Sequence, residues 1–231
     1  MLVIIVPFRA TNQPERKEQL AIFLDLMPVL LPDAKIVIAE QTNDGRLFNA
    51  GLLINACFLE LKLSDDDLIC IHHVDLIPDK DIISEYTKEL NLQTVRHIGS
   101  AWKRYKKKFF CTGIVLMHAA NFSAVNGFPN DMWGWGGEDV ILGRRIRNCK
   151  LHNITVERSI GTIKDQENIS SAHDKFKHLR ETKGMGKGLF KRIRWYKTEN
   201  NLFLRGLHQA QYNLVNKSEN NTHVTLLINF D

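Results

Sequence analysis

The chain has 231 residues, of which 44% are hydrophobic and 25% are charged, with 14 glycines and 6 prolines. This composition is typical of a globular protein and excludes a collagen-like, fibrous or disordered chain. The net charge is only +5, and we expect one domain over residues 1–231, because a single core grows to about 250 residues before it divides.

Predicted strands and helices alternate along the first part of the chain. The continuous apolar run at residues 1–8 predicts a buried parallel strand, residues 34–40 predict a second strand, and residues 68–72 predict a third, buried strand. Helical spacing of apolar residues predicts one helix that starts near Asn12–Glu15 and ends at Pro28, and a second over residues 48–61. This order indicates a doubly wound α/β fold, with a mostly parallel central sheet flanked by helices. Ligands of such sheets bind beyond the carboxyl ends of the strands.

The sequence predicts no membrane-spanning helix, because it contains no run of about 18 apolar residues. The N-terminus does not have the three regions of a signal peptide, so we expect a cytoplasmic protein. The cysteines show no CxxC spacing and are expected to be free thiols: Cys57, Cys70, Cys111 and Cys149.

The net positive charge comes from one segment, residues 174–197. It contains nine Lys and Arg residues against Asp174 and Glu181, and the rest of the chain sums to −2. Aromatic residues lie between these cations, which favours contact with an anionic membrane surface or an acidic ligand. A solvated face is the alternative. No nucleic-acid partner is expected, because no nucleic-acid-binding motif accompanies the basic residues.

Polar residues end the third predicted strand abruptly, between His72 and Pro78. A carboxylate at such a strand end, here Asp75, suits Mg²⁺ or Mn²⁺, which prefer oxygen ligands and leave positions open for phosphate oxygens. An Asp that caps the next turn is the alternative at this position.

A second polar cluster lies between Gly127 and Asp139 and includes the run WGWGGED. Glycine allows close backbone approach, and Trp offers a flat apolar face for a sugar ring. Glu138 and Asp139 can supply a base and a hydrogen-bond acceptor for hydroxyl groups. The structural alternative is a Trp-anchored turn before a helix with an acidic first turn, and both interpretations can hold together.

Together these segments resemble the β-1,4-galactosyltransferase family, whose members are inverting, metal-dependent enzymes of the glycosyltransferase A fold. In chain order the resemblance is carried by IIVPFR, FNAGLLINACF, HVDLIP, VRHIG, FFCTGIVLM, NGFPNDMWGWGGEDV, GLHQAQY and THVTLLINFD. It implies transfer of galactose from UDP-galactose to a saccharide hydroxyl, with β-1,4 linkage and with Mn²⁺ or another divalent cation. It also implies a nucleotide-binding half, residues 1–80, and an acceptor-binding and catalytic half, residues 81–231.

The resemblance implies roles for single residues as well. Asp139 would be the general base, and Asp75 would bind Mn²⁺. The donor would be bound by Pro7, Phe8, Arg9, Phe48, Val74, Asp75, Lys103 and Trp135. The acceptor would be bound by Trp135, Gly136, Glu138 and Asp139.

Some positions depart from the family pattern. His73 replaces the first Asp of the family's DVD metal motif, and Ala50 replaces an Arg near the diphosphate. We expect Lys103 or the lysines at 106–108 to supply the missing charge. Phe110 replaces a family Tyr, and its bulk favours UDP-galactose over UDP-N-acetylgalactosamine. The alternative functions are a transferase for the acetamido sugar, a polymer-synthesising relative and, less expected, a glycan-binding pseudoenzyme.

The rest of the metal shell fits the family least well. Counted from Asp139, the family's other ligands fall 26 and 29 residues further on, at Asp165 and Asn168. Asn is a poor replacement for imidazole, and His173 is the nearest later histidine. We therefore expect a shell of Asp75, Asp165 and His173. The alternative is that Asp165 alone joins Asp75.

The sequence shows neither the disulfide pair nor the membrane anchor and stem of the family's secreted members. The resemblance therefore implies a cytoplasmic bacterial or viral enzyme that is peripheral at the inner membrane surface. Its acceptor would be a lipid-linked saccharide, with residues 174–197 in contact with anionic lipid.

Overall fold

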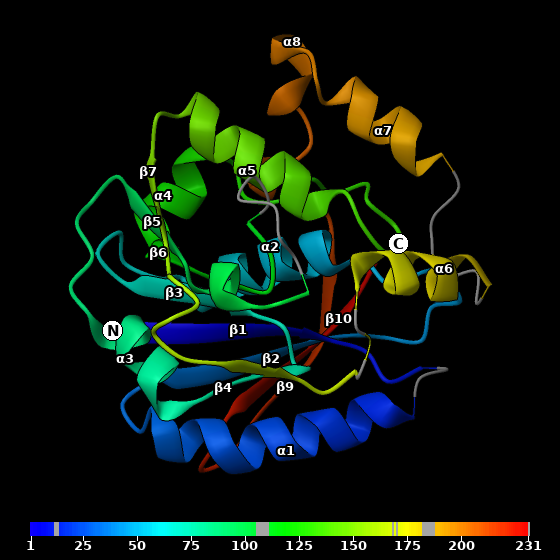
Figure 1. Cartoon of the computed structure of the whole chain (residues 1–231). Coiled ribbons are helices and arrows are strands. Elements are labelled where there is room, and N and C mark those ends of the chain that lie inside the picture. The colour runs from blue at the N-terminus through cyan, green and yellow to red at the C-terminus, as the bar shows by residue number, and fades with distance from the viewer. Residues whose placement is uncertain (12–13, 105–110, 168, 170, 182–187, 231) are drawn as a thin grey trace.

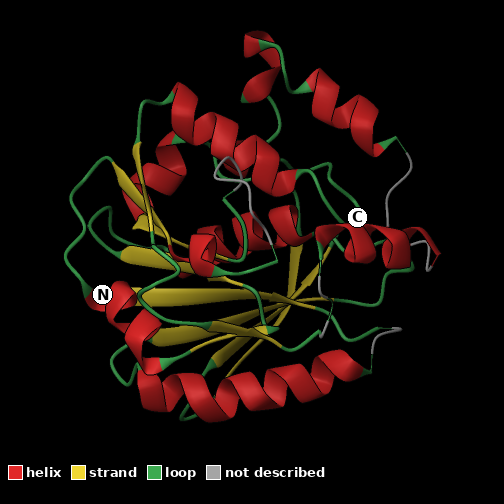
Figure 2. Ribbon diagram, in the orientation of Figure 1, coloured by secondary structure: helices red, strands yellow, loops and turns green. Residues whose placement is uncertain are grey.

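A twisted sheet with helices on both faces forms the body of the molecule (Figures 1 and 2). The computed structural model describes all residues except 12–13, 105–110, 168, 170, 182–187 and 231. The strands are β1 (Leu2–Phe8), β2 (Lys35–Gln41), β3 (Leu68–His72), β4 (Leu76–Pro78), β5 (Thr94–His97), β6 (Ile114–His118), β7 (His152–Thr155), β8 (Ile163–Asp165), β9 (Asn213–Glu219) and β10 (Val224–Asn229). The α-helices are α1 (Glu15–Leu30), α2 (Ala50–Leu61), α3 (Lys80–Thr87), α4 (Ala119–Ala124), α5 (Glu138–Asn148), α6 (Ala172–Glu181), α7 (Leu189–Trp195) and α8 (Glu199–Leu202). Two short 3-10 helices are η1 (Ile98–Ala101) and η2 (Leu207–Gln209).

In the described part of the chain, the main sheet has the strand order β7-β5-β6-β3-β1-β2-β10-β9, and β4 pairs separately with β8. The four central strands, from β3 to β10, are parallel, and β5 is parallel to β7. The other pairs, β3–β6, β5–β6 and β9–β10, are antiparallel. The predicted doubly wound sheet flanked by helices is therefore present, but it is a mixed sheet whose parallel pairs are concentrated at its centre.

The central strand β1 is buried on both faces, as its continuous apolar run predicts. Ile4 and Val6 pack into the core that contains α1, whereas Val3 and Ile5 pack into the core that contains α2. This alternation follows from the two-residue period of a strand. Full burial of an aliphatic side chain of this size stabilises the fold by about 1.5–3 kcal/mol, so the two cores fix α1 and α2 on opposite faces of the sheet.

The predicted helices are present with shifted ends. α1 continues past Pro28 to Leu30, because a proline near the end of a helix removes one hydrogen bond but keeps a helical φ. α2 starts at Ala50 rather than residue 48, because the side chain of Asn49 caps it by accepting the Leu52 N–H at 3.0 Å. No helix in the described residues combines the length and the apolarity that crossing a bilayer requires.

The chain changes direction across the sheet between β1 and β3. From β1 it passes through α1 to β2 on one side, and from β2 it returns through α2 to β3 on the other side of β1. The two helices cover opposite faces (Figure 1). The carboxyl ends of β1 and β3, at Phe8 and His72, therefore lie side by side at a topological switch point, where α/β sheets bind their ligands.

Candidate active site

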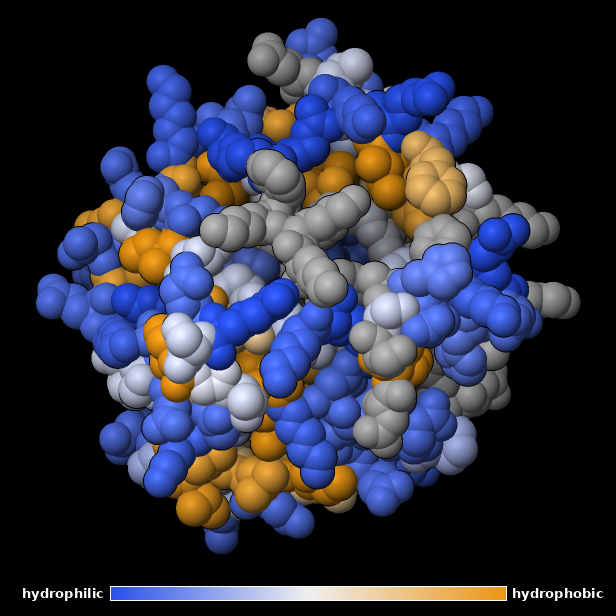
Figure 3. Space-filling model, in the orientation of Figure 1, coloured by the Kyte–Doolittle hydropathy of each residue, from blue (hydrophilic) through white to orange (hydrophobic). Residues whose placement is uncertain are grey.

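A cleft of about 750 Å³ opens at this switch point. Its walls come from the segment after β1, the turn after β3, the glycine-rich loop before α5, and the helices α6 and α7. In Figure 1, α6 and α7 lie on the right, at the side toward which β1 points. Figure 3 shows hydrophobic side chains at the upper right, over α7, with hydrophilic ones around them. Segments that are far apart in the sequence thus face one common space.

One end of the cleft holds residues that the resemblance assigns to the donor: Pro7, Phe8, Arg9, Phe48 and Val74. The guanidinium carbon of Arg9 lies 5.6 Å from the centroid of the Phe48 ring. The same side chain donates to the carbonyl of Arg46 at 2.9 Å, which fixes its position. A flat ring beside a fixed cation suits a ligand that joins an aromatic base to phosphate groups.

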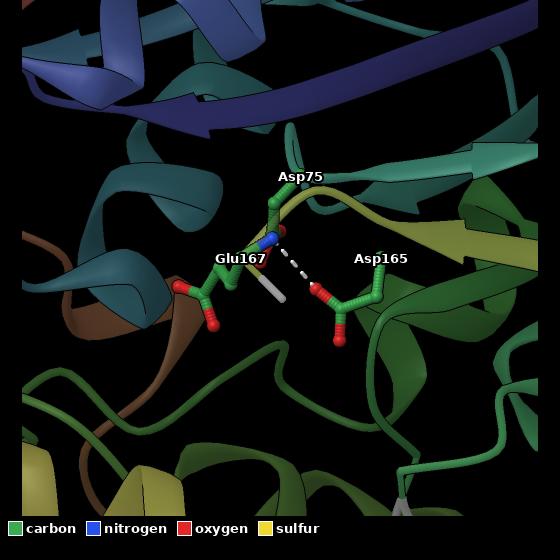
Figure 4. A group of neighbouring side chains, drawn as sticks. All are labelled: Asp75, Asp165 and Glu167. Atoms are coloured by element: carbon green, nitrogen blue, oxygen red, sulfur yellow. Dashed lines mark hydrogen bonds between the residues drawn. The ribbon is translucent and has the colours of Figure 1, made fainter. Parts of the chain in front are cut away.

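Three carboxylates meet beside this end of the cleft (Figure 4). The antiparallel pairing of β4 with β8 sets Leu76 opposite Asp165, so Asp165 approaches Asp75 although the two are distant in sequence. One oxygen each of Asp75, Asp165 and Glu167 lies within 4.8 Å of the others. The backbone N–H of Glu167 donates to Asp165 at 2.9 Å, as the dashed line shows. We call this group the carboxylate cluster.

Three cations surround the carboxylate cluster. Arg16 and Arg104 contact Glu167 at 2.6 and 2.7 Å, and Lys175 pairs with the same carboxylate. Burial by itself raises the pKa of Glu167, but the charges of Lys175 and Arg16 and hydrogen bonds from Lys175 and Arg104 more than offset this and lower the pKa to about 2. Burial raises the pKa of Asp165, although it pairs with Arg104. Glu167 is therefore ionised at neutral pH.

The third carboxylate of the cluster is Glu167. His173, which we predicted as a metal ligand, lies outside the cluster. Its side chain is exposed in the first turn of α6. Asp75 and Asp165 do come together as the sequence predicted. The alternative position, Asn168, lies outside the described residues.

The position of the cationic side chains also differs from the prediction. Lys103 is exposed in the turn after η1, whereas its neighbour Arg104 is buried and lines the cleft. The guanidinium of Arg104 stacks 4.7 Å from the Trp102 ring, which turns it inward. Of the two described cations of this loop, Arg104 is therefore the one that lines the cleft. The lysines at 106–108 and Phe110 lie outside the described residues.

The carboxylate cluster fits a hard divalent cation. It offers three carboxylates and no sulfur or nitrogen donor, and Mg²⁺ and Mn²⁺ prefer such oxygen ligands. Asp75 and Glu167 also line the cleft, so an ion bound between them would be open to a ligand there. Because Glu167 shares its oxygens with three cations, an ion would compete with these ion pairs for it.

The glycine-rich loop forms the opposite wall. Gly134, Gly136 and Gly137 have φ values of 80°, 96° and 102°, which residues with a Cβ rarely adopt. The N–H of Gly134 donates to the carbonyl of Phe48 at 2.7 Å, so the loop is fixed to the donor end of the cleft. Trp135, which we predicted to contact both substrates, is half-buried and lines the cleft between these glycines.

Glu138 and Asp139 form the first turn of α5 and line the cleft. Burial, and then the charge of Asp139, raises the pKa of Glu138 well above its ordinary value. One oxygen of Glu138, Oε2, is buried and has no hydrogen-bond partner among the described residues. Burial and the neighbouring carboxylate therefore both favour the neutral form of Glu138.

The helix α7 packs against the glycine-rich loop and closes that side of the cleft. A Cβ on Gly137 would lie 3.1 Å from side-chain atoms of Leu189 and of Ile193, so the loop and α7 are in close contact. Phe190 lines the cleft and is 69% exposed. The hydroxyl of Tyr196 donates to Asp131, which ties the end of α7 to the segment before the loop.

The basic segment, residues 174–197, does not form one uniform face. Lys175 turns inward to Glu167. The exposed cations are Lys177, Arg180, Lys191, Arg194 and Lys197, and residues 182–187 lie outside the described part. The four cysteines have no disulfide, as predicted.

Besides Arg104, the sequence prediction missed three charged residues of the site. Glu167 had a signal, because an acid two residues after Asp165 points to the same side when the backbone is extended. Arg16 and Lys175 had none, because only the packing of α1 and α6 brings them to the cluster.

Comparison with known proteins agrees with this geometry. A family model described as the N-terminal domain of galactosyltransferase matches residues 95–170. Mouse β-1,4-galactosyltransferase 4 is 29% identical over 99% of the chain, and human β-1,4-galactosyltransferase 6 is 30% identical over 98% of it. The chain spans 63% and 56% of the length of these two relatives.

Solved structures show the same fold. The catalytic domain of Drosophila β-1,4-galactosyltransferase 7, in complex with xylobiose, superposes with a TM-score of 0.78 at 24% identity, over 100% of this chain and 94% of that one. A mutant of that enzyme, described as a complex with manganese, UDP-Gal and xylobiose, superposes with a TM-score of 0.77. The fold is the glycosyltransferase A fold that the resemblance implied. The chain is thus similar to β-1,4-galactosyltransferases over nearly its whole length, matches the galactosyltransferase family model over residues 95–170, and has the same fold.

Proposed function

We propose that the chain is a UDP-sugar-dependent glycosyltransferase that moves galactose from UDP-galactose to a saccharide hydroxyl, with inversion and a β-1,4 linkage. The observation that carries this proposal is that one cleft combines the donor end, the carboxylate cluster and the Glu138–Asp139 pair. The solved relative described with manganese, UDP-Gal and xylobiose supports the same ligand classes.

The donor-side residues of the cleft are proposed to bind the nucleotide. Phe8 and Phe48 enclose the base beside Arg9, and Val74 completes this wall. Arg104 takes the place proposed for Lys103, because its guanidinium faces the cleft and can neutralise the diphosphate. This part of the proposal assigns the wall around the base to residues 1–80 and the acceptor and general base to residues 81–231, with Arg104 of the second half reaching the diphosphate.

The carboxylate cluster is proposed as the metal site, with Asp75, Asp165 and Glu167 as ligands. When bound, Mn²⁺ or another hard divalent cation supplies positive charge that stabilises a diphosphate leaving group. Glu167 takes the place that the sequence assigned to His173, because its carboxylate is the one that lies with the other two.

The transfer itself is proposed to run as a single displacement. The acceptor hydroxyl oxygen attacks the anomeric carbon, the bond from that carbon to the diphosphate oxygen breaks, and UDP leaves with the bonding electrons. Asp139 takes the hydroxyl proton as the general base. Glu138, whose Oε2 has no hydrogen-bond partner among the described residues, binds and orients the acceptor hydroxyls together with Trp135 and Gly136.

The finer proposal concerns the acceptor and the place where the enzyme acts. We propose a lipid-linked saccharide and a cytoplasmic enzyme that contacts anionic membrane through residues 174–197. The exposed cations of α6 and α7 and the exposed ring of Phe190 at the mouth of the cleft support it, because such a surface combines charge with an apolar side chain.

The test of the function is an acceptor screen with purified protein, UDP-galactose and Mn²⁺, with and without EDTA. We expect transfer to at least one glycan acceptor and its loss with EDTA. A parallel reaction with UDP-N-acetylgalactosamine tests the donor, for which Phe110 favours galactose. Transfer of the acetamido sugar at equal or higher kcat/KM would contradict the donor assignment, and absence of any transfer would favour a glycan-binding protein.

A further inference from the structure

Two polar side chains are fully buried in the apolar core behind the carboxylate cluster: His72 at the end of β3 and Tyr86 in α3. The Tyr86 hydroxyl lies 2.8 Å from Nε2 of His72, and Nδ1 of His72 lies 2.9 Å from the carbonyl oxygen of His73. The ring of Phe23 packs edge-on against the imidazole, with 5.0 Å between the centroids. Both nitrogens of the imidazole therefore have a partner.

The direction of these hydrogen bonds follows from the partners. A carbonyl oxygen only accepts, so Nδ1 of His72 carries the hydrogen and donates to His73. Burial lowers the pKa of His72 to about 3, and a neutral imidazole that is protonated on Nδ1 accepts at Nε2. The hydroxyl of Tyr86 is then the donor to His72. The chain of bonds runs from α3 through the core to one carbonyl.

That carbonyl closes the turn that carries Asp75. The carbonyl of His73 also accepts the N–H of Leu76 at 3.2 Å, which makes residues 73–76 a four-residue turn with Asp75 in third place. At the start of the turn, the N–H of His73 donates to the carbonyl of Gly113 at 2.9 Å. The turn is therefore held from the core side at its first residue.

Gln166 holds the same turn from the other side. Its backbone N–H donates to the carbonyl of Asp75 at 2.8 Å, and its side chain donates to the carbonyl of Val74 at 3.2 Å. Because Gln166 lies between Asp165 and Glu167, these bonds join the two acidic segments. The orientation of the turn therefore decides whether the carboxylate of Asp75 meets the other two.

We propose that His72 and Tyr86 are positioning residues for the metal site, which act by holding the 73–76 turn so that Asp75 joins the carboxylate cluster. This inference rests on the proposed function, since it requires that the cluster binds a divalent cation. Buried hydrogen bonds contribute only about 1 kcal/mol each to net stability, and apolar side chains could fill the same space. An apolar side chain could not give the His73 carbonyl the bond that it accepts from Nδ1 of His72 in addition to the one from Leu76.

Tyr86→Phe tests the inference, because it keeps the ring and removes the donor. Nε2 of the imidazole then has no donor, so the ring keeps only its bond from Nδ1 to the His73 carbonyl and is held less firmly. We expect an affinity for Mn²⁺ about tenfold lower, on the scale seen when partners of metal ligands are removed. The measurement is titration of free Mn²⁺ by electron paramagnetic resonance in the presence of UDP. Tyr212→Phe is the matched control, since its hydroxyl donates to Glu60 at 2.8 Å and neither residue lines the cleft.

His72→Asn separates positioning from packing. The Asn amide can donate to the His73 carbonyl as Nδ1 does, but it fills less space in the core. We expect a lower thermal midpoint than for Tyr86→Phe together with a smaller loss of Mn²⁺ affinity. If the two residues only stabilised the fold, the variant with the lower thermal midpoint would also show the larger loss of Mn²⁺ affinity. The ¹⁵N resonances of the imidazole should show hydrogen on Nδ1 in the unaltered chain and in Tyr86→Phe, with a changed Nε2 resonance in the variant because Nε2 has lost its donor.

The outcomes separate this inference from the proposed function. If the unaltered chain binds no Mn²⁺, both fall. If it binds Mn²⁺ and Tyr86→Phe binds it equally well, the positioning role is wrong and the proposed function stands. A loss of Mn²⁺ affinity in Tyr86→Phe, with the affinity of Tyr212→Phe unchanged, supports the positioning role.

Discussion

Glu167→Gln removes one negative charge from the most strongly paired carboxylate of the site. The substitution keeps the size of the side chain and an oxygen that accepts hydrogen bonds. It leaves Arg16, Arg104 and Lys175 without the charge that they share in the folded chain. The variant therefore measures how much these ion pairs stabilise the fold.

The magnitude follows from the pKa of Glu167, which is about 2 in the folded chain against an ordinary value of 4.5. At about 1.4 kcal/mol per pH unit, this difference corresponds to about 3 kcal/mol of unfolding free energy. Because the folded pKa is lowered, this stability is fully present above pH 4.5 and is lost as the pH falls toward 2. We expect the variant to be less stable by about 3 kcal/mol at pH 6 and by about half of that at pH 3.

Urea unfolding at pH 6 and pH 3 measures both differences. Glu157→Gln is the control, because that side chain is exposed in the loop after β7, and its loss should change stability by less than about 0.5 kcal/mol at either pH. A deficit of Glu167→Gln that is the same at both pH values would refute the electrostatic reasoning. So would a deficit at pH 6 no larger than that of the control.

Three further predictions concern activity and binding. Asp139→Asn should lower turnover by about 10²-fold or more and leave UDP-galactose affinity nearly unchanged in calorimetric titration; near-normal turnover would exclude Asp139 as the base. Gly137→Ala should raise the acceptor KM more than Gly45→Ala does. Both glycines have positive φ, but a Cβ at Gly137 would meet α7, whereas a Cβ at Gly45 would have no atom within 4 Å. Equal acceptor kinetics in the two variants would show that α7 does not shape the acceptor site. The protein should co-sediment with anionic vesicles at low ionic strength and dissociate from them as salt is added, since each basic residue near such a surface contributes up to about 1 kcal/mol. If the double variant Lys191→Glu, Lys197→Glu binds the vesicles as well as the unaltered chain does, α7 is not the contact.

Much of the fold was predictable from local pattern. The run at residues 1–8 could only be a strand buried on both faces, and the strand Leu68–His72 begins and ends where its apolar run does. The ends of helices were less predictable, because Asn49 acts as a cap and Pro28 is tolerated in a last turn. The residues at which a helix begins and ends depend on a few hydrogen bonds rather than on the spacing of its hydrophobic residues.

The site shows the same division. WGWGGED and HVDLIP drew attention to the two walls of the cleft by their residue types, and the family resemblance then assigned their roles. Lys103 and Arg104 are adjacent cations, and composition cannot tell which one turns inward. The stacking of Arg104 on Trp102 decided it.

By itself, then, the sequence determined the alternation of strands and helices, the edge of the sheet where the site lies, and the acids Asp75, Glu138 and Asp139 that face the cleft. Only the tertiary structure decided that Glu167, rather than His173, completes the carboxylate cluster. The antiparallel pairing of β4 with β8 joins segments that are far apart in the chain, and α6 turns Lys175 inward while it leaves His173 exposed. The physical reason is that a ligand set depends on the direction of side chains across a long-range contact, which residue spacing along the chain does not fix.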